Sequence, residues 1–297
     1  MPVPYSAAKV DLYQPAKNAV FFSNGRPVSE AALCVEMARL AYCQLEGSFP
    51  FDQARIRQIL EPVGFAQCTF FEHPIGTNGG GSHGMLMLDE KTNLAVLAFR
   101  GTNNSDPTDI MNDLNAVPRP WPSGGNVSSG FADALMVLWN QEGLEKAVQA
   151  IKGYDLLITG HSLGAAMATL AASLVTTKSL YTFGSPRVGD DSFVKKFDGV
   201  DNRRYVDCCD LVARVPPEGF LGYTHIPGQI HYIGSDRTLS ERDPASPADD
   251  QFMNADQANA EIAYLQDYSW RIGDVAIRAL ADHAPVNYVW PVTAATP

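Results

Sequence analysis

The chain has 297 residues, a length that fits one large domain or two small ones. Hydrophobic residues make up 45% of it and charged residues 19%, a balance too apolar for a disordered protein. The net charge of −11 argues against a nucleic-acid partner and against electrostatic docking on anionic membranes, because both require a basic face. No apolar run approaches the ~20 residues that span a bilayer, so no transmembrane segment is expected.

The first third of the chain predicts two helices followed by three strands. Ser29 is expected to cap a helix that runs through Tyr42, and Asp52 a shorter helix that stops at Pro62. The three strands are expected near 65–71, 84–88 and 94–99.

The middle of the chain alternates helical and strand patterns. Helical stretches are expected at 129–152, 163–175 and 190–197. Strands are expected at 155–160, which is predicted to be buried, and at 180–183 and 204–209, so that helix and strand alternate along the chain. This alternation predicts an α/β fold with a mostly parallel central sheet and helices on both faces.

The last third of the chain is less regular. Residues 223–233 are expected to form a hairpin that turns at Pro227-Gly228, and 235–251 to form a polar surface loop or an insertion. A long helix, roughly 255–281, is expected to close the chain. No internal repeat or linker divides the sequence, so a single domain over 1–297 is predicted.

The first residues and the cysteines bear on the cellular location. The start lacks a basic stretch followed by an apolar one, so no signal peptide is visible. The cysteines are odd in number and match neither a disulfide framework nor a zinc-site spacing; they are Cys34, Cys43, Cys68, Cys208 and Cys209. Reduced, mostly buried thiols are expected, in a protein that is cytoplasmic or exported without a leader.

A serine motif carries the strongest chemical signal. Gly160-His-Ser-Leu-Gly164 matches G-x-S-x-G and lies between an apolar strand and a helix. That context predicts a strained turn that presents the Ser162 hydroxyl, with the first N–H groups of the helix directed at a developing oxyanion. Ser162 is therefore the predicted nucleophile.

A serine nucleophile needs a histidine base and a carboxylate that orients it, and after this kind of turn both come later in the chain. Three histidines satisfy that order: His225, His231 and His283. Asp207 and Asp210, at the end of a predicted strand, are the best candidates for the acid. The residues by themselves leave these alternatives open.

Five ordered motifs run through the middle of the chain. They are Phe-Arg-Gly-Thr at 99–102, Gly-Phe at 130–131, the serine motif at 158–164, Tyr-Thr-Phe-Gly-Ser-Pro-Arg-Val-Gly at 181–189, and Arg-Tyr-Val at 204–206 before Asp-Leu-Val-Ala-Arg-Val-Pro at 210–216. With a weaker match at 282–288, they resemble the class 3 lipases, the fungal-type triacylglycerol lipase family of the α/β-hydrolase superfamily.

The resemblance implies an α/β-hydrolase fold with Asp210 as the triad acid and His283 as the base. It implies an oxyanion hole formed by Thr102 and Leu163. Asp207 is then expected to pair with an arginine such as Arg203. No metal and no cofactor are expected.

A short helix is also predicted at about 104–122, where Asp106-Pro107 is a typical helix start. It is either an ordinary surface helix or a lid over Ser162, and the resemblance favours the lid. Asp113 matches a family aspartate that orients the oxyanion threonine, and it could equally be a surface carboxylate. Ile110 stands where the family commonly has a tryptophan in the lid.

The activity implied is that of a serine carboxylic-ester hydrolase, a lipase or esterase that cleaves acylglycerols or shorter acyl esters through an acyl-enzyme. The expected partner is thus an ester or lipid at a lipid–water interface. An aryl-ester hydrolase of the feruloyl esterase kind and a phospholipase are alternatives with the same chemistry, and a non-catalytic binding protein is an alternative of another class.

Overall fold

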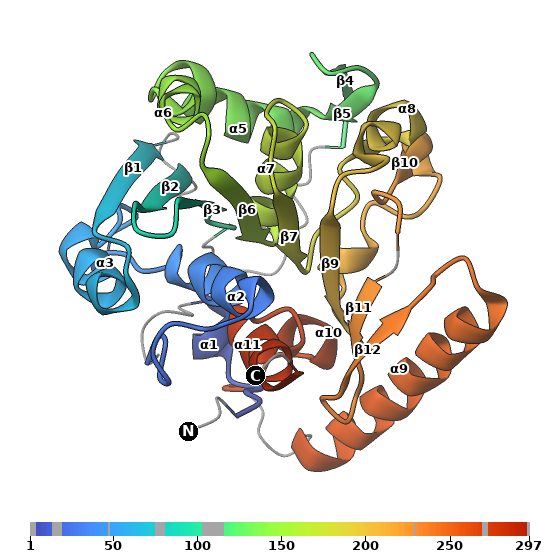
Figure 1. Cartoon of the computed structure of the whole chain (residues 1–297). Coiled ribbons are helices and arrows are strands. Elements are labelled where there is room, and N and C mark those ends of the chain that lie inside the picture. Colours follow the sequence, from blue (N-terminus) through green and yellow to red (C-terminus); the bar gives the residue numbers. More distant parts are fainter. Residues whose placement is uncertain are drawn as a thin grey trace.

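The computed structural model describes residues 4–13, 20–46, 48–74, 81–102, 116–228, 230–268 and 273–295 (Figure 1). An eight-stranded sheet lies at its centre, in the order β1 (Gln67–His73), β2 (Ser82–Asp89), β3 (Leu94–Phe99), β6 (Asp155–His161), β7 (Ser179–Phe183), β9 (Asn202–Asp207), β11 (Ile230–Ile233) and β12 (Leu239–Arg242). Every neighbouring pair from β3 to β11 is parallel, whereas the pairs at both ends of the sheet are antiparallel. The predicted mostly parallel sheet is confirmed.

Helices cover both faces of this sheet, as predicted. One face carries α2 (Glu30–Leu40) and α11 (Pro285–Ala295), and the other carries α5 (Ser129–Asn140) and α7 (Leu163–Ala172) (Figure 1). Neighbouring residues of β3, such as Val96 and Leu97, therefore pack into opposite cores. A strand buried on both faces is apolar at every position, which explains the continuous apolar run of β3.

The remaining elements are short or lie at the edges. The helices are α1 (Lys9–Tyr13), α3 (Gln53–Leu60), α6 (Leu144–Ala150), α8 (Asp191–Val194), α9 (Pro247–Tyr268) and α10 (Arg278–Ala281), with 3₁₀ turns η1 (Glu61–Val63), η2 (Lys195–Phe197), η3 (Val212–Arg214) and η4 (Phe220–Gly222). A second, antiparallel sheet has the order β10 (Tyr223–Thr224), β8 (Gly189–Asp190), β5 (Asn126–Ser128) and β4 (Pro118–Pro120).

The predicted caps of α2 and α3 are present. The Ser29 hydroxyl accepts the N–H of Ala32 at 3.1 Å, and the Asp52 carboxylate accepts that of Arg55 at 3.0 Å. The helical stretch expected from 129 to 152 is instead two helices, α5 and α6. Gly143 separates them with a φ of 81°, a conformation that favours glycine.

The hairpin expected at 223–233 is wrong. Strand β10 pairs with β8 in the second sheet, whereas β11 joins the central sheet between β9 and β12. The alternation of residue types correctly indicates two strands here, but a local pattern does not determine with which other strands they pair. The closing helix also differs, because α9 begins at Pro247, inside the polar stretch, and ends at Tyr268.

Most of the lid expected at 104–122 lies outside the described residues. These are positions 104–115, which include Ile110 and Asp113. Within the remainder, Trp121 is buried, and its Nε1 donates to the hydroxyl of Ser173 at 2.8 Å. The lid and the single domain over 1–297 stay predictions. Among the described helices, none has the length and apolarity needed to cross a bilayer.

The end of β3 is anchored by a buried arginine. Arg100 donates from Nη1 to the carbonyl oxygen of Phe49 at 2.6 Å, and its Nη2 lies 2.6 Å from Nδ1 and 3.0 Å from Nε2 of His83. Nδ1 of His83 also lies 2.9 Å from the carbonyl oxygen of Gly81. Burial lowers the pKa of Arg100 to about 10 and, together with Arg100, lowers that of His83 to about 3.

The end of β9 is anchored by a buried ion pair. Nη1 of Arg237 lies 2.8 and 2.7 Å from the carboxylate oxygens of Asp207, which is fully buried. The expected partner, Arg203, instead pairs with Asp201 at the surface, at 3.3 Å. That expectation is wrong because Arg203 and Asp207 are four residues apart on one strand, whereas β12 and its preceding turn bring Arg237 onto the strand end.

Arg237→Met should lower the free energy of unfolding by about 3–5 kcal/mol at neutral pH, because it would leave the Asp207 carboxylate buried without its partner. Arg203→Met is the matched control, since it removes an exposed pair that contributes ~0–1 kcal/mol. Urea unfolding followed by circular dichroism measures both. Equal losses of unfolding free energy in the two variants would contradict the pairing of Asp207 with Arg237.

His83→Gln should flatten the dependence of stability on pH. The unfolded ring titrates near 6.5 and the folded ring near 3, so between these values the unfolded state binds a proton that the folded state does not. Stability is therefore lost as the pH falls, by about 1.2 kcal/mol per pH unit near pH 5.5 for this group. Urea titrations at several pH values between ~5 and ~7 measure the slope, and an unchanged slope in the variant would overturn the argument.

Candidate active site

Ser162 lies in the turn between β6, which ends at His161, and α7, which begins at Leu163. Its backbone has φ 61° and ψ −128°, a conformation that is costly for a non-glycine residue and that clusters at functional sites. A Cβ on Gly160 would overlap the carbonyl oxygen of Gly164. The glycine at 160 therefore lets strand and helix close around the serine.

Asp210 and His283, 73 residues apart in the sequence, meet in a hydrogen-bonded pair. Nδ1 of His283 lies 3.0 and 2.9 Å from the two carboxylate oxygens of Asp210, and both side chains are buried. Because a carboxylate only accepts, Nδ1 carries the proton and Nε2 is left to accept one. Nε2 is buried and has no hydrogen-bond partner among the described residues.

Ser162 and this pair border the same short segment, Phe183-Gly184, at the end of β7. Ser162 donates its backbone N–H to the carbonyl oxygen of Phe183 at 3.1 Å. A Cβ on Gly184 would lie 3.0 Å from Nδ1 of His283 and 2.6 Å from a carboxylate oxygen of Asp210, and the φ of 57° also favours glycine. Any side chain at position 184 would push the acid and the histidine apart.

Several donors surround the Asp210 carboxylate. Besides His283, the hydroxyl of Tyr288 donates to Oδ2 at 2.5 Å and the N–H of Val212 to Oδ1 at 2.8 Å. Burial raises the pKa of Asp210, but the facing His283 and the hydrogen bonds from His283 and Tyr288 outweigh it and hold the pKa below its ordinary value. The carboxylate is therefore ionised at neutral pH.

His161, beside the serine, supports the segment that carries His283. Its Nε2 donates to the carbonyl oxygen of His283 at 2.7 Å, so its Nδ1 accepts from the hydroxyl of Tyr42, also at 2.7 Å. Burial, and then His283, lowers the pKa of His161 well below its ordinary value, so this ring stays neutral. Its ring centroid lies 4.5 Å from that of His283.

The end of β3 packs on the other side of Ser162. A Cβ on Gly101 would lie 3.0 Å from Cβ of Ser162, so the backbone passes directly beside the serine. The next residue, Thr102, has a buried hydroxyl with no hydrogen-bond partner among the described residues. Leu163 opens α7, where the first N–H groups of a helix have no partner within the helix.

The other predicted candidates have different contacts. Nε2 of His225 lies 2.8 Å from the carbonyl oxygen of Ala213, and the ring of His231 stacks on that of Tyr205 at 4.6 Å. Asp207 is engaged by its arginine, as described above. Within the described chain, the structure thus brings His283 and Asp210 together and places the remaining candidates in structural contacts.

Sequence patterns did not assign roles to three residues that complete this arrangement: Tyr42, Gly184 and Tyr288. Gly184 and Tyr288 belong to the quoted motifs, which was the available signal. Their contacts with the acid depend on segments that are far apart in the sequence, so no local pattern reveals them.

Comparisons with known proteins agree with this architecture. The family model described as "Lipase (class 3)" matches residues 96–220. The "Secreted mono- and diacylglycerol lipase MDL3" of Malassezia globosa is 30% identical over 212 residues, which cover 59% of this chain and 68% of that protein. The "Lipase" of Rhizopus niveus is 31% identical over 169 residues, which cover 52% of this chain and 42% of that protein. The chain thus spans less than half the length of the Rhizopus relative.

Two solved structures show the fold. The crystal structure of a mutant form of MDLA, the mono- and diacylglycerol lipase A of Penicillium cyclopium, has a TM-score of 0.53 and 19% identity, covering 86% of this chain and 95% of that chain. The structure titled "LIPASE II FROM RHIZOPUS NIVEUS" has a TM-score of 0.54 and 23% identity, covering 73% of this chain and 85% of that chain. The predicted α/β-hydrolase fold is therefore confirmed.

The comparison with relatives also contradicts the expected location, which was the cytoplasm or export without a leader. Relatives from Malassezia, Fusarium and Penicillium are named secreted lipases. All five cysteines are free and buried, as expected. Burial inside the fold shields a thiol from partners in any compartment, so unpaired cysteines do not indicate a reducing one.

The ordered motifs, the family model, the Malassezia relative, of which this chain covers more than two thirds, and the shared fold all point to one family. This chain belongs to the class 3 lipases, the fungal-type lipase family of the α/β-hydrolase superfamily.

Proposed function

We propose that the chain is a serine carboxylic-ester hydrolase that cleaves acylglycerols or shorter acyl esters. One observation carries the proposal: His283 donates from Nδ1 to Asp210 while its buried Nε2 stays without a partner among the described residues, in a site that also holds the strained Ser162. A base with one nitrogen oriented and the other available is what a serine nucleophile requires. The names of the relatives, lipase and mono- and diacylglycerol lipase, support the substrate class.

In the proposed reaction, Oγ of Ser162 attacks the ester carbonyl carbon while Nε2 of His283 takes the hydroxyl proton. The bond from the acyl carbon to the alcohol oxygen then breaks, and the imidazolium returns its proton to that oxygen. Water then attacks the acyl carbon while Nε2 of His283 takes a proton from it, the bond from the acyl carbon to Oγ of Ser162 breaks, and Nε2 returns the proton to Oγ. The ionised Asp210 stabilises the imidazolium throughout, and each step moves a proton between groups that the chain, the substrate and water supply.

The developing oxyanion needs preorganised donors. The backbone N–H of Leu163, at the start of α7, is one candidate, and the N–H or hydroxyl of Thr102 is the other. The buried hydroxyl of Thr102, unpartnered within the described chain, supports its part in the oxyanion hole, since buried polar groups without partners are rare in folded proteins.

We also infer, from relatives named as secreted lipases, that the protein acts outside the cell. The substrate class can be tested with a chain-length series of nitrophenyl esters, alongside emulsified mono-, di- and triacylglycerols and methyl ferulate. Turnover of acylglycerols supports the proposal. Turnover of methyl ferulate alone would favour an aryl-ester hydrolase, and turnover of no ester would overturn the proposed activity.

Ser162→Ala and His283→Ala should each reduce kcat to below ~1% of wild type, because each removes a member of the proposed triad while leaving the fold intact. The double variant should be no slower than either single variant, since triad members act as a unit. Nitrophenyl-ester kinetics at saturating substrate measures this.

His231→Ala and His225→Ala serve as matched histidine controls, because their contacts lie away from Asp210. Both variants should keep most of the wild-type kcat. A loss in either one as deep as that of His283→Ala would refute the choice of base.

Thr102→Val should lower kcat by ~10²–10³ with little change in KM if the hydroxyl donates to the oxyanion, because this donor acts in the transition state. Thr102→Ser keeps the hydroxyl and should keep most of the activity. A small loss in Thr102→Val would assign the role to the backbone N–H alone, and a loss confined to KM would point to substrate binding.

A further inference from the structure

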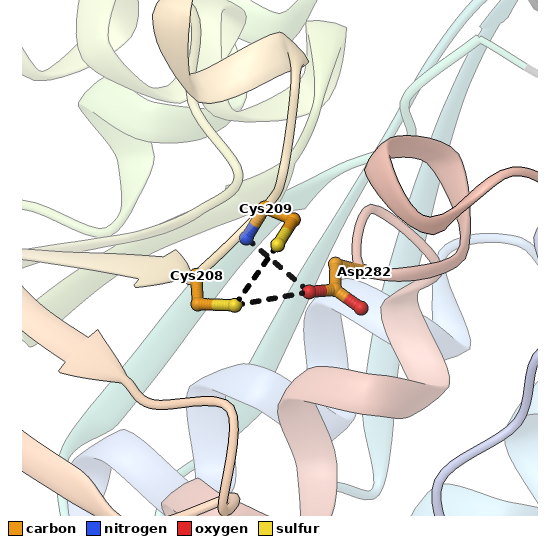
Figure 2. A group of neighbouring side chains, drawn as sticks. All are labelled: Cys208, Cys209 and Asp282. Carbon is orange, nitrogen blue, oxygen red and sulfur yellow. Dashed lines mark hydrogen bonds between the residues drawn. The ribbon is translucent and has the colours of Figure 1, made fainter. Parts of the chain in front are cut away.

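Two adjacent cysteines form the turn between β9 and Asp210. The N–H of Asp210 donates to the carbonyl oxygen of Asp207 at 3.1 Å, which makes Cys208 and Cys209 the two central residues of a β-turn. Both are buried, and their sulfur atoms lie 3.1 Å apart. Figure 2 shows the two side chains beside each other, with Asp282 next to them. The pair thus immediately precedes the proposed triad acid.

The peptide bond between the two cysteines is held from both ends. The N–H of Cys209 donates to Oδ2 of Asp282 at 3.2 Å, and Nη2 of Arg214 donates to the carbonyl oxygen of Cys208 at 2.9 Å (Figure 2 shows the first contact). These two contacts set the direction in which the chain enters Asp210. A rotation of this peptide bond would therefore be passed directly to the carboxylate.

Cys208, Cys209 and Asp282 also form the one group of three potential metal ligands in the described part of the chain. The charge of Asp282 is already compensated, because Nε of Arg278 lies 2.8 Å from its carboxylate and the hydroxyl of Tyr5 donates to it at 2.7 Å. A cation would have to displace that guanidinium and two thiol protons from a buried site. The arrangement is better explained as a pair of thiols than as a metal site.

We propose that Cys208 and Cys209 are a modification site, at which a peroxide closes a disulfide between the two neighbouring residues and thereby slows the hydrolase by displacing Asp210. The effect on activity rests on the proposed function, whereas the disulfide itself does not.

The chemistry balances with a hydroperoxide as the oxidant. One sulfur attacks the peroxide oxygen, the O–O bond breaks, and a sulfenic acid and one molecule of water or alcohol result. The second sulfur attacks the sulfenic sulfur, the S–S bond forms, and a further water leaves with the second thiol proton. Two electrons pass from the two thiols to the peroxide, and a dithiol reductant reverses the change.

The geometry of neighbouring residues makes this disulfide strained. Cα atoms joined by a trans peptide are about 3.8 Å apart, below the ~4.4–6.8 Å of most disulfides. Strained disulfides are the reducible, regulatory ones. The sulfurs must also approach by about 1 Å from their present separation. Any rotation of the 208–209 peptide bond during that approach would break its contacts with Asp282 and Arg214. Misplacement of a catalytic group by ~1 Å can cost ~10²-fold in rate.

Both thiols are buried, so peroxide reaches them only when this region opens locally. A pocket of about 410 Å³ is lined by Tyr264, Leu265, Ile277 and Arg278 among others. Nη2 of Arg278 lies 3.8 Å from the sulfur of Cys208, so a movement of this one side chain would bring the pocket closer to the thiol. The hydrogen bond with Cys209, burial and Asp282 raise the pKa of the Cys208 thiol, so reaction is slow at neutral pH and a brief exposure should leave the thiols intact.

The experiment treats the full-length protein with hydrogen peroxide, blocks free thiols with iodoacetamide under denaturing conditions and digests with trypsin. Cleavage after Arg204 and Arg214 releases both cysteines in one peptide, 205–214. The expected product is this peptide lighter by two hydrogen atoms and not alkylated. In parallel, kcat on a nitrophenyl ester should fall by ~10²-fold with KM nearly unchanged. Dithiothreitol should restore the wild-type kcat and the reduced, alkylatable peptide.

Cys209→Ser and Cys208→Ser each remove the possibility of the disulfide, and Cys68→Ser in β1 is the matched control because it leaves the pair intact. The first two variants should lose the sensitivity to peroxide, and Cys68→Ser should keep it. Two alkylated cysteines after treatment, or an oxidised peptide with unchanged kcat, would overturn the proposal. So would equal inactivation of Cys209→Ser, or thiols that react only after a chelator removes a bound metal. If untreated protein cleaves no ester, the proposed function fails, and the peptide mass still decides whether the disulfide forms.

Discussion

The buried pair of Asp210 and His283 is the contact on which the rest of this structure depends. An ionised carboxylate inside a protein is costly unless it is hydrogen-bonded. Here the imidazole, the hydroxyl of Tyr288 and a backbone N–H together satisfy it, and they come from a loop, from α11 and from the turn after β9. Gly184, at the end of β7, lies against both partners and leaves room for their contact, because it has no side chain. The fold thereby brings a remote histidine onto a strand end.

A second layer of buried charges fixes the segments that carry this pair. The turn before the acid is held by Asp207 with Arg237, and the residue before the histidine, Asp282, is held by Arg278. The carbon atoms of both guanidinium groups lie over the ring of Tyr5, 5.0 and 5.2 Å from its centroid. Each half of the acid–histidine pair therefore has its own buried ion pair, and an aromatic ring from the start of the chain connects the two.

Much of the fold follows from local patterns in the sequence. Apolar runs, caps such as Ser29 and the glycine-flanked serine indicate the central strands, the helices that cover them and the strained turn, because each depends on residues close together in the chain. The partners of 223–233 and the arginine on Asp207 could not be predicted, because pairing is decided by strands that meet only in three dimensions. For the same reason, motif resemblance was needed to choose His283 among three histidines, and the contacts of Tyr288 appear only in the structure.

Residues Ser6 and Ala7 contact the part of the chain that carries His283. Asn287 donates from Nδ2 to the carbonyl oxygen of Ser6 and accepts the N–H of the same residue, a contact that spans 281 positions, and the N–H of Ala276 donates to Ala7. Contacts between residues so far apart in the sequence have to close a long loop, which costs chain entropy. The position of His283 therefore depends on the folding of the whole stretch of chain between these two segments, and not on its local sequence.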